Sequence, residues 1–175
     1  SAIFLMAIPP MVFGEQAYAL TAWIMLAALI GGTFLFCAAL FARVFGTRRS
    51  VGVCAAALVC IIATQTLVSP VQGFYWYNGA VYYTFFYGLA LAALALGIRL
   101  AADGGAWRAV LLTVLAVFIG GGNYVTALST VIVGVSALAL LAIMRDKCAR
   151  RLIIPVAALI AALVVSVAAP GNAVR

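Results

Sequence analysis

The stretch "TAWIMLAALIGGTFLFCAALFA", residues 21–42, holds 22 consecutive residues without a charged side chain. A helix rises about 1.5 Å per residue, so this stretch is long enough to cross the roughly 30 Å hydrocarbon core of a bilayer. Its apolar residues do not alternate with polar ones, as they would in the strands of a membrane β-barrel. The stretch therefore predicts a membrane-spanning α-helix.

The composition of the whole chain agrees with this prediction. Of its 175 residues, 69% are hydrophobic and 7% are charged. Soluble domains are about 45–50% apolar and about 25% charged, and a domain of this size leaves much of its surface in water. We therefore predict an all-α fold, a polytopic transmembrane helix bundle.

Charged or turn-rich breaks divide the chain into six predicted spans. They are 16–42, 51–69, 79–99, 108–121, 124–144 and 152–169. The region 108–144 is short for two crossings, because one span takes about 20 residues. Its only evident turn is "GGGNY", residues 120–124. Either the two helices of a hairpin are short, or the turn is part of a re-entrant element below the membrane surface, where protein or water must satisfy its backbone.

The basic residues predict the orientation of the bundle. With six alternating spans, nine of the ten basic residues fall on one side: Arg43, Arg48, Arg49, Arg99, Arg108, Arg145, Lys147, Arg150 and Arg151. The positive-inside rule makes this side cytoplasmic, which predicts a multi-pass membrane protein with cytoplasmic basic loops. The charges are divided among three short loops, so we expect membrane lipids as partners and no nucleic acid.

The ends and the rare residue types set further expectations. The sequence starts at Ser1 within an apolar run, without an initiator Met, and ends at Arg175 directly after a polar turn. We therefore expect it to be a piece of a longer membrane protein. It has no histidine and three carboxylates, so we expect no cofactor in this segment. Whether a divalent metal takes part and whether the protein forms oligomers are left open.

The segment "FYWYNGAVYYTFFY", residues 74–87, holds nine of the chain's twenty aromatic residues. Trp and Tyr favour the membrane–water interface, so an aromatic belt is one interpretation. Aromatic faces combined with amides also suit a sugar or a lipid headgroup. A belt does not require amides and glycines among its rings, so we select Gln72, Trp76, Tyr77 and Asn78 as candidate substrate-binding residues.

Other polar features fall on the same predicted side. Asn123 follows three glycines, which either let a ligand approach the backbone or allow close helix packing. The segment "PGNAVR", residues 170–175, ends a helix, and its Asn172 and Arg175 are candidates for phosphate binding, because Arg suits bidentate recognition of phosphate. Glu15 is the only acidic residue on this side. It is either a solvated surface carboxylate or a candidate general base or metal ligand.

Two of these elements, "WYNGAVYY" at 76–83 and "APGNAVR" at 169–175, carry a resemblance. They resemble the W-x-x-G-x-x-x-Y and A-P-G-N-x-x-R elements of a family of uncharacterised bacterial multi-pass membrane proteins. That family is similar to GT-C-type glycosyltransferases, which use polyprenyl-phosphate sugars. The resemblance implies a place in the bacterial inner (plasma) membrane, a polyprenyl-phosphate sugar as partner and glycosyl transfer at the outer face. It also implies that the catalytic carboxylate lies in a loop ahead of this chain.

Three hypotheses about function follow. In the first, the chain is part of a membrane glycosyltransferase-like protein that handles a lipid-phosphate-linked sugar. Asn172 and Arg175 would then hold the phosphate, and Trp76, Tyr77 and Asn78 would hold the sugar or the acceptor. The second is a lipid or polysaccharide export component without bond chemistry, and the third is a structural membrane subunit.

Overall fold

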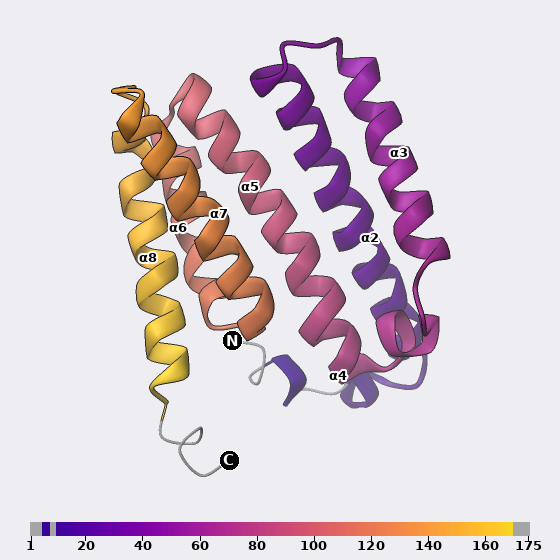
Figure 1. Cartoon of the computed structure of the whole chain (residues 1–175). Helices are drawn as coiled ribbons and strands as arrows, with labels where there is room; N and C mark the ends of the chain where they lie inside the picture. The colour runs from indigo at the N-terminus through magenta and orange to yellow at the C-terminus, as the bar shows by residue number, and fades with distance from the viewer. Residues whose placement is uncertain (1–4, 8–9, 170–175) are drawn as a thin grey trace.

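The computed structural model describes residues 5–7 and 10–169 of the chain. Within these residues the regular structure is helical, with 85% helix and no strands. Six long helices run up and down side by side in one bundle (Figure 1). Most of the connections at its two ends are short, and residues 66–85 form a longer one. The prediction of an all-α fold is therefore confirmed.

The helices follow one another along the chain in the order of the predicted spans. The long ones are α2 (Gln16–Ala39), α3 (Arg49–Gln65), α5 (Phe86–Asp103), α6 (Ala106–Gly120), α7 (Tyr124–Ile143) and α8 (Ala149–Val167). The short ones are η1 (Pro10–Phe13), η2 (Leu40–Val44), η3 (Val71–Tyr75), α4 (Tyr77–Gly79) and η4 (Ala80–Phe85). Of these, η2, η3 and η4 are π-helical turns, and η2 continues α2 without a break.

Four helical stretches among the described residues are long and apolar enough to cross a membrane. They are Gln16–Val44, Tyr77–Asp103, Tyr124–Ile143 and Ala149–Val167. The two remaining apolar helices are shorter, with 17 residues in α3 and 15 in α6. At about 1.5 Å per residue, α6 is roughly 22 Å long, less than the thickness of the hydrocarbon core. The membrane crossing of α3 and α6 stays a prediction.

The boundaries of two helices differ from the predicted ones. The predicted span 51–69 ends too late, because the helix stops at Gln65, five residues before Pro70. The hydroxyl of Thr66 donates to the Ile62 carbonyl oxygen at 2.8 Å and satisfies one of the last carbonyl groups of the helix. The predicted span 79–99 is too short, because helical structure runs from Tyr77 to Asp103 and stops at Gly104, whose φ is +70°.

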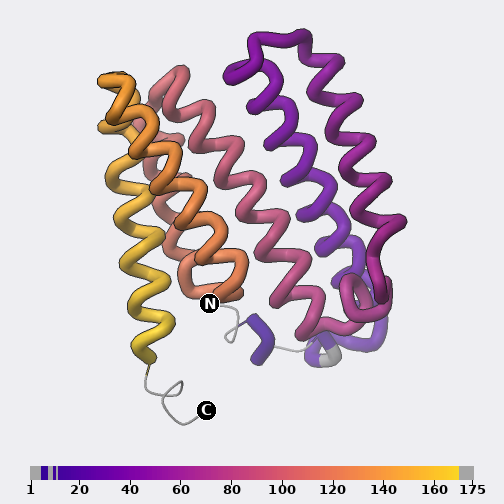
Figure 2. The backbone as a smooth tube through the Cα atoms, viewed as in Figure 1, coloured from indigo at the N-terminus to yellow at the C-terminus, as the bar shows by residue number. Residues whose placement is uncertain are grey.

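The bundle has two parts that meet at α5. Helices α2 and α3 lie on one side of α5, and α6, α7 and α8 lie on the other (Figure 2). The larger buried cluster belongs to the second part and consists of Ala90, Ala93, Leu100, Leu112, Ala116, Ile119, Leu152 and Leu159. Its side chains come from α5, α6 and α8, so these three helices form one continuous apolar core.

Glycines bring α2 and α5 into backbone contact. A Cβ atom added to Gly88 of α5 would lie 2.5 Å from the carbonyl oxygen of Ala28 in α2, and one added to Gly32 would collide with the Gly88 carbonyl. Side chains of any size would force the helices apart. This contact requires a glycine at position 32. It does not require one at position 31, where an added Cβ would meet no atom within 4 Å. The α2–α5 contact is thus a close small-residue packing of the kind found between membrane helices.

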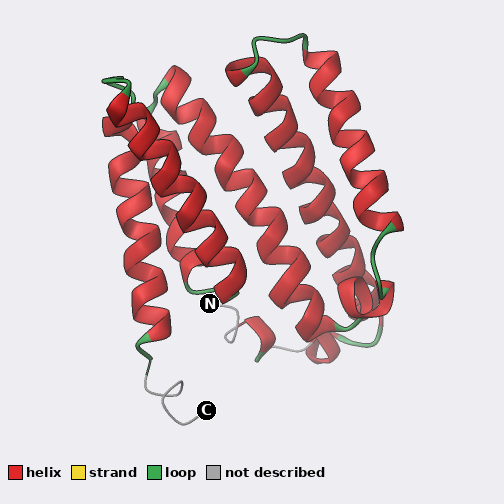
Figure 3. Ribbon diagram, viewed as in Figure 1, coloured by secondary structure: helices red, strands yellow, loops and turns green. Residues whose placement is uncertain are grey.

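The two ends of the bundle differ in chemistry. The α2–α3, α5–α6 and α7–α8 connections lie together at one end (Figure 3), which we call the basic end: residues 43–49, 99–108 and 145–151. It holds the nine basic residues that the sequence placed on one side. Arg43 and Asp103 form an ion pair of 3.0 Å there, which links η2 to the end of α5. We call the opposite end, with residues 5–7, 10–16, 69–85 and 120–124, the aromatic end.

The glycine contact gives a first testable prediction. Gly32→Ala should lower the free energy of unfolding by about 1–3 kcal/mol, because the added methyl overlaps the α5 backbone. Gly31→Ala is the matched control and should leave stability unchanged or raise it by up to about 1 kcal/mol, because alanine is the better helix former. Thermal unfolding in detergent, followed by circular dichroism, measures both. Equal stability of the two variants would contradict the contact.

Candidate functional site

The aromatic segment 74–87 presents rings to both the core and the surface. Five rings, those of Phe74, Tyr77, Tyr82, Phe85 and Phe86, pack in a second apolar cluster around Met25, Ala80 and Val81. Four rings, those of Tyr75, Trp76, Tyr83 and Tyr87, are more than half exposed. The segment therefore anchors the aromatic end internally and offers exposed rings at the same time.

The Trp76 ring lies against the backbone of Gly79. A Cβ atom on Gly79 would collide with this ring and would lie 2.9 Å from the carbonyl oxygen of Gln72. The Thr84 hydroxyl donates to the Gly73 carbonyl oxygen at 2.6 Å and ties η4 to η3. Glycine at position 79 thus allows a tight fold in which Trp76 has a fixed place although it is 55% exposed.

The other predicted residues of this segment differ in their surroundings. The side chains of Gln72 and Asn78 are exposed, and that of Tyr77 is half-buried. The Tyr77 hydroxyl donates to the Leu5 carbonyl oxygen at 2.8 Å, so it fastens residues 5–7 to the segment. Glu15 is exposed at the residue before α2, and its side chain caps no backbone group there.

Asn123 is the most buried of the predicted residues, with 1% of its surface exposed. Its Oδ1 accepts a hydrogen bond from the Thr126 backbone N–H at 3.0 Å and caps α7. Its Nδ2 has no hydrogen-bond partner among the described residues. Buried amide groups are nearly always paired, so this N–H₂ group is free to bind a water molecule or a ligand oxygen.

The turn that carries Asn123 is covered by protein. An added Cβ on Gly122 would collide with the Phe86 ring, which itself stacks on Phe118 at 5.4 Å between ring centroids. Gly120 lies against α8, where an added Cβ would be 2.8 Å from the Leu159 carbonyl oxygen. Figure 1 shows this turn set back from the level that α5 and α8 reach. The region 108–144 is thus a hairpin with a short first helix and a buried turn.

The structure brings most of the predicted site residues to one end of the bundle. Glu15, Gln72, Trp76, Tyr77, Asn78 and Asn123 all belong to the aromatic end, on three segments far apart in the sequence. Asn172 and Arg175 lie outside the described residues. Their assignment to phosphate therefore stays a prediction.

The sequence analysis missed a large apolar groove. It has a volume of about 650 Å³, lies between α2, α5 and α7, and is also lined by residues of α6 and α8. Its lining includes Phe36, Leu40, Ala93, Gly97, Ala101, Ile119, Val133, Gly134, Ala137 and Leu141, with Arg43, Asp146 and Cys148 at the basic end. The small residues on α5 and α7 leave this space open.

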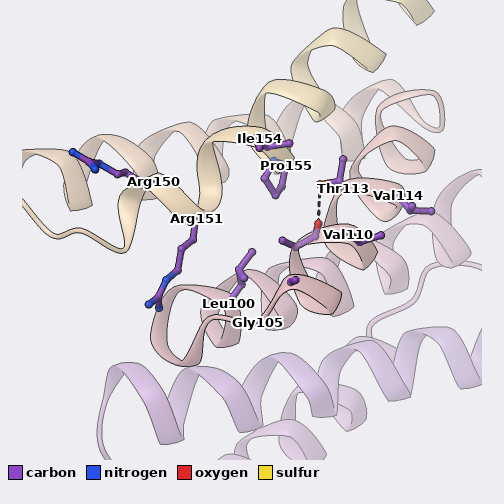
Figure 4. Close-up of a pocket in the computed structure, with 11 residues that line it drawn as sticks. Leu100, Gly105, Val110, Thr113, Val114, Arg150, Arg151, Ile154 and Pro155 are labelled. Atoms are coloured by element: carbon purple, nitrogen blue, oxygen red, sulfur yellow. Dashed lines mark hydrogen bonds between the residues drawn. The ribbon is translucent and has the colours of Figure 1, made fainter.

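A second groove, of about 570 Å³, lies between α6 and α8 at the basic end (Figure 4). Its walls are apolar, with Val110 and Val114 from α6 and Ile154 and Pro155 from α8. At its mouth, Arg151 Nη1 donates to the Ala101 carbonyl oxygen at 2.8 Å. An arginine beside the last turn of α5 also interacts favourably with the helix dipole.

The α7–α8 connection contains a carboxylate and a thiol that influence each other. The Cys148 backbone N–H donates to the Asp146 carboxylate at 2.9 Å, which lowers the pKa of Asp146. A hydrogen bond with the same carboxylate raises the pKa of the Cys148 thiol. Asp146 is therefore ionised at neutral pH, and its carboxylate is used in a hydrogen bond within the α7–α8 connection.

Comparison with known proteins gives no match: the chain matches no protein-family model, no curated protein and no solved structure. The roles of the aromatic end and of the two grooves therefore rest on their own geometry and chemistry.

Asn123 gives a second prediction, which separates its two roles. Asn123→Ala should lower the free energy of unfolding by about 1 kcal/mol, because the α7 cap is lost. Asn123→Ser should retain most of the stability, since serine caps a helix about as well as asparagine. Thermal unfolding in detergent distinguishes the two. If Asn123→Ser is as unstable as Asn123→Ala, the side chain stabilises the fold through more than the cap.

The thiol of Cys148 gives a third prediction. Asp146→Asn should speed alkylation of Cys148 by a maleimide several-fold at pH 7.5, because removing the carboxylate lowers the pKa of the thiol and the thiolate is the reactive form. Asp103→Asn removes the other carboxylate of the basic end and should leave the rate unchanged. Labelling is followed by mass spectrometry of the peptide. Equal rates in the two variants would contradict the effect of Asp146.

Proposed function

We propose that this chain is a multi-pass protein of the bacterial inner membrane that handles a lipid-phosphate-linked sugar at its aromatic end. The observation that carries the proposal is that candidate residues from three distant segments lie at one end of the bundle: the aromatic and amide side chains of residues 72–78, the amide of Asn123 and the carboxylate of Glu15. All nine basic residues of the three loops belong to the opposite end. This asymmetry supports a cytoplasmic basic end and an external aromatic end.

The proposal includes six membrane crossings. Helices α3 and α6 run alongside longer neighbours, and both run from the basic end toward the aromatic end (Figure 1). Arg49 at the start of α3 and Arg108 in the first turn of α6 are at the basic end in both cases. Each helix must therefore cross if its longer neighbours do.

The exposed groups of the aromatic end suit a sugar. The fixed Trp76 ring offers a face for stacking on the apolar face of a pyranose, and the amides of Gln72 and Asn78 can both donate to and accept from hydroxyl groups. Asn172 and Arg175 are the residues that we assign to the phosphate.

Transfer of the sugar would break the bond between the anomeric carbon and the phosphate oxygen and form one to an acceptor hydroxyl. The hydroxyl proton must pass to a base, and the leaving phosphate must be stabilised by donors or cations. The resemblance to GT-C-type enzymes assigns this base to a catalytic carboxylate of an external loop, outside the described residues. Glu15 is the fallback, because it is the carboxylate of the aromatic end among the described residues.

Native mass spectrometry of the detergent-purified full-length protein tests the proposal. We expect a co-purified polyprenyl phosphate or its sugar ester on the wild type and at least a tenfold lower occupancy on Asn78→Ala. Gln65→Ala removes an exposed amide at the end of α3 and is the matched control, which should retain the lipid.

Other results would redirect the assignment. Ordinary phospholipids alone in all three samples would contradict the proposal and favour a structural subunit. A polyprenyl lipid that stays bound without any sugar transfer would favour an export component. The 650 Å³ groove between α2, α5 and α7 is the observation that supports this second candidate, because its apolar lining suits a lipid chain.

A further inference from the structure

The groove between α6 and α8 combines an apolar floor with an arginine-rich mouth. We propose that it binds one anionic phospholipid from the membrane leaflet at the basic end. The phosphate would lie at Arg150, and one acyl chain would lie between α6 and α8. This site is at the opposite end from the proposed sugar site, so it does not depend on sugar transfer.

The charges at the mouth favour an anion. Arg150 lines the groove, is exposed, and its side chain has no hydrogen bond or ion pair with any described residue. Arg151 lines it too and gives one N–H to the Ala101 carbonyl oxygen, which leaves other donors of its guanidinium for a ligand. Basic pockets between membrane helices on the cytoplasmic side are typical sites for anionic headgroups.

The carboxylates near this end leave Arg150 without a partner in the described part of the chain. Asp103 is paired with Arg43 at 3.0 Å and lies 4.0 Å from Arg108. Asp146 accepts the backbone N–H of Cys148 at 2.9 Å, and its charge also interacts with Arg151. Arg150 is therefore the arginine of the mouth whose charge is available to an anion.

The walls of the groove suit an acyl chain. Val110, Val114 and Ile154 are 64%, 60% and 69% exposed, so they already present apolar surface to the surroundings of the bundle. The one hydroxyl of the lining, on Thr113, donates to the Ala109 carbonyl oxygen at 2.7 Å, as the dashed line in Figure 4 shows. A polar ligand such as a sugar would find few partners along these walls.

The length of the groove selects a lipid over a partner helix. Along α6 the lining runs from Gly105 to Val114, nine residues further on. At about 1.5 Å per residue this is roughly 14 Å, about half of the roughly 30 Å hydrocarbon core. A lipid of one leaflet has this reach, whereas a membrane-spanning helix of a partner would need a groove along the whole bundle.

Titration of the purified full-length protein with phosphatidylglycerol and with phosphatidylcholine of the same chains, read by native mass spectrometry, tests the site. We expect tighter binding of phosphatidylglycerol. Arg150→Gln should weaken it roughly fivefold, the effect of one basic residue near a lipid phosphate. Arg49→Gln removes an exposed arginine in the first turn of α3, at the same end, and should leave the affinity unchanged.

A second pair of variants tests the acyl-chain groove. Ala109→Phe places a ring in the groove and should weaken binding of both lipids, whereas Ala139→Phe, on the exposed face of α7, should not. Circular dichroism checks that each variant is folded, and Arg150→Gln decides the question if Ala109→Phe does not fold.

Equal affinities of Arg150→Gln and Arg49→Gln, or of the two lipids, would overturn the proposal. Displacement of phosphatidylglycerol by 10 mM inorganic phosphate would overturn the lipid assignment and leave a free-anion site, because a lipid is held by its acyl chain as well as by its headgroup.

Discussion

The contact between the backbones of α2 and α5 holds the bundle together at its centre. Lipid tails are as apolar as leucine side chains, so membrane helices associate through close packing and hydrogen bonds and gain little from the hydrophobic effect. Gly32 and Gly88 allow that packing, because an added Cβ at either position would meet the backbone of the other helix. The same two helices reach both ends. The pair of Arg43 with Asp103 joins them at the basic end, and Met25 of α2 packs in the aromatic cluster with Phe86 at the other.

In the second half of the bundle, close packing of one pair of helices leaves a space beside another pair. Gly120 brings α6 against α8, and α7 packs more on α8 than on α5. A space is left between α5, α7 and α2, where small residues such as Gly97, Gly134 and Ala137 stand among larger apolar ones, and it forms the larger groove. The short α6 ends in a turn that Phe86 covers, which buries Asn123 and leaves its N–H₂ group without a partner among the described residues. Close packing of one helix pair thus creates the open space beside another.

The helices were predictable because each is an uncharged apolar run between polar breaks. The end of α3 was not predictable from the sequence. The helix ends at Gln65, but no charged residue marks that point in residues 66–69. The two-sided nature of the aromatic segment was also beyond prediction. Its rings sit on two π-helical turns around the short α4, so neither helical nor strand periodicity applies. The grooves depend on the distances between helices, which no single apolar run encodes.

The predicted site residues divide in the same way. Counting spans predicted that these residues share one end of the bundle, and the structure places the described site residues there. The sequence did not predict their surroundings, because the burial of Asn123 depends on Phe86 from another segment and the position of Trp76 depends on Gly79. Gly31 and Gly32 were equivalent in the sequence, yet only Gly32 touches α5. Composition and charge therefore define the class of protein and its ends, and packing decides which residues can bind.

The most direct test of the account is two-sided labelling of single-cysteine variants in intact cells with a membrane-impermeant maleimide. The positions are Gly105 and Cys148 at the basic end and Asn78 and Tyr124 at the aromatic end; Tyr124 is the exposed residue next to the buried turn. Six crossings predict that Asn78→Cys and Tyr124→Cys react from outside, and that Gly105→Cys and Cys148 react only after the membrane is opened. Reaction of positions 105 and 124 from the same side would show that α6 does not cross, and would contradict the bundle orientation on which the proposed sites rest.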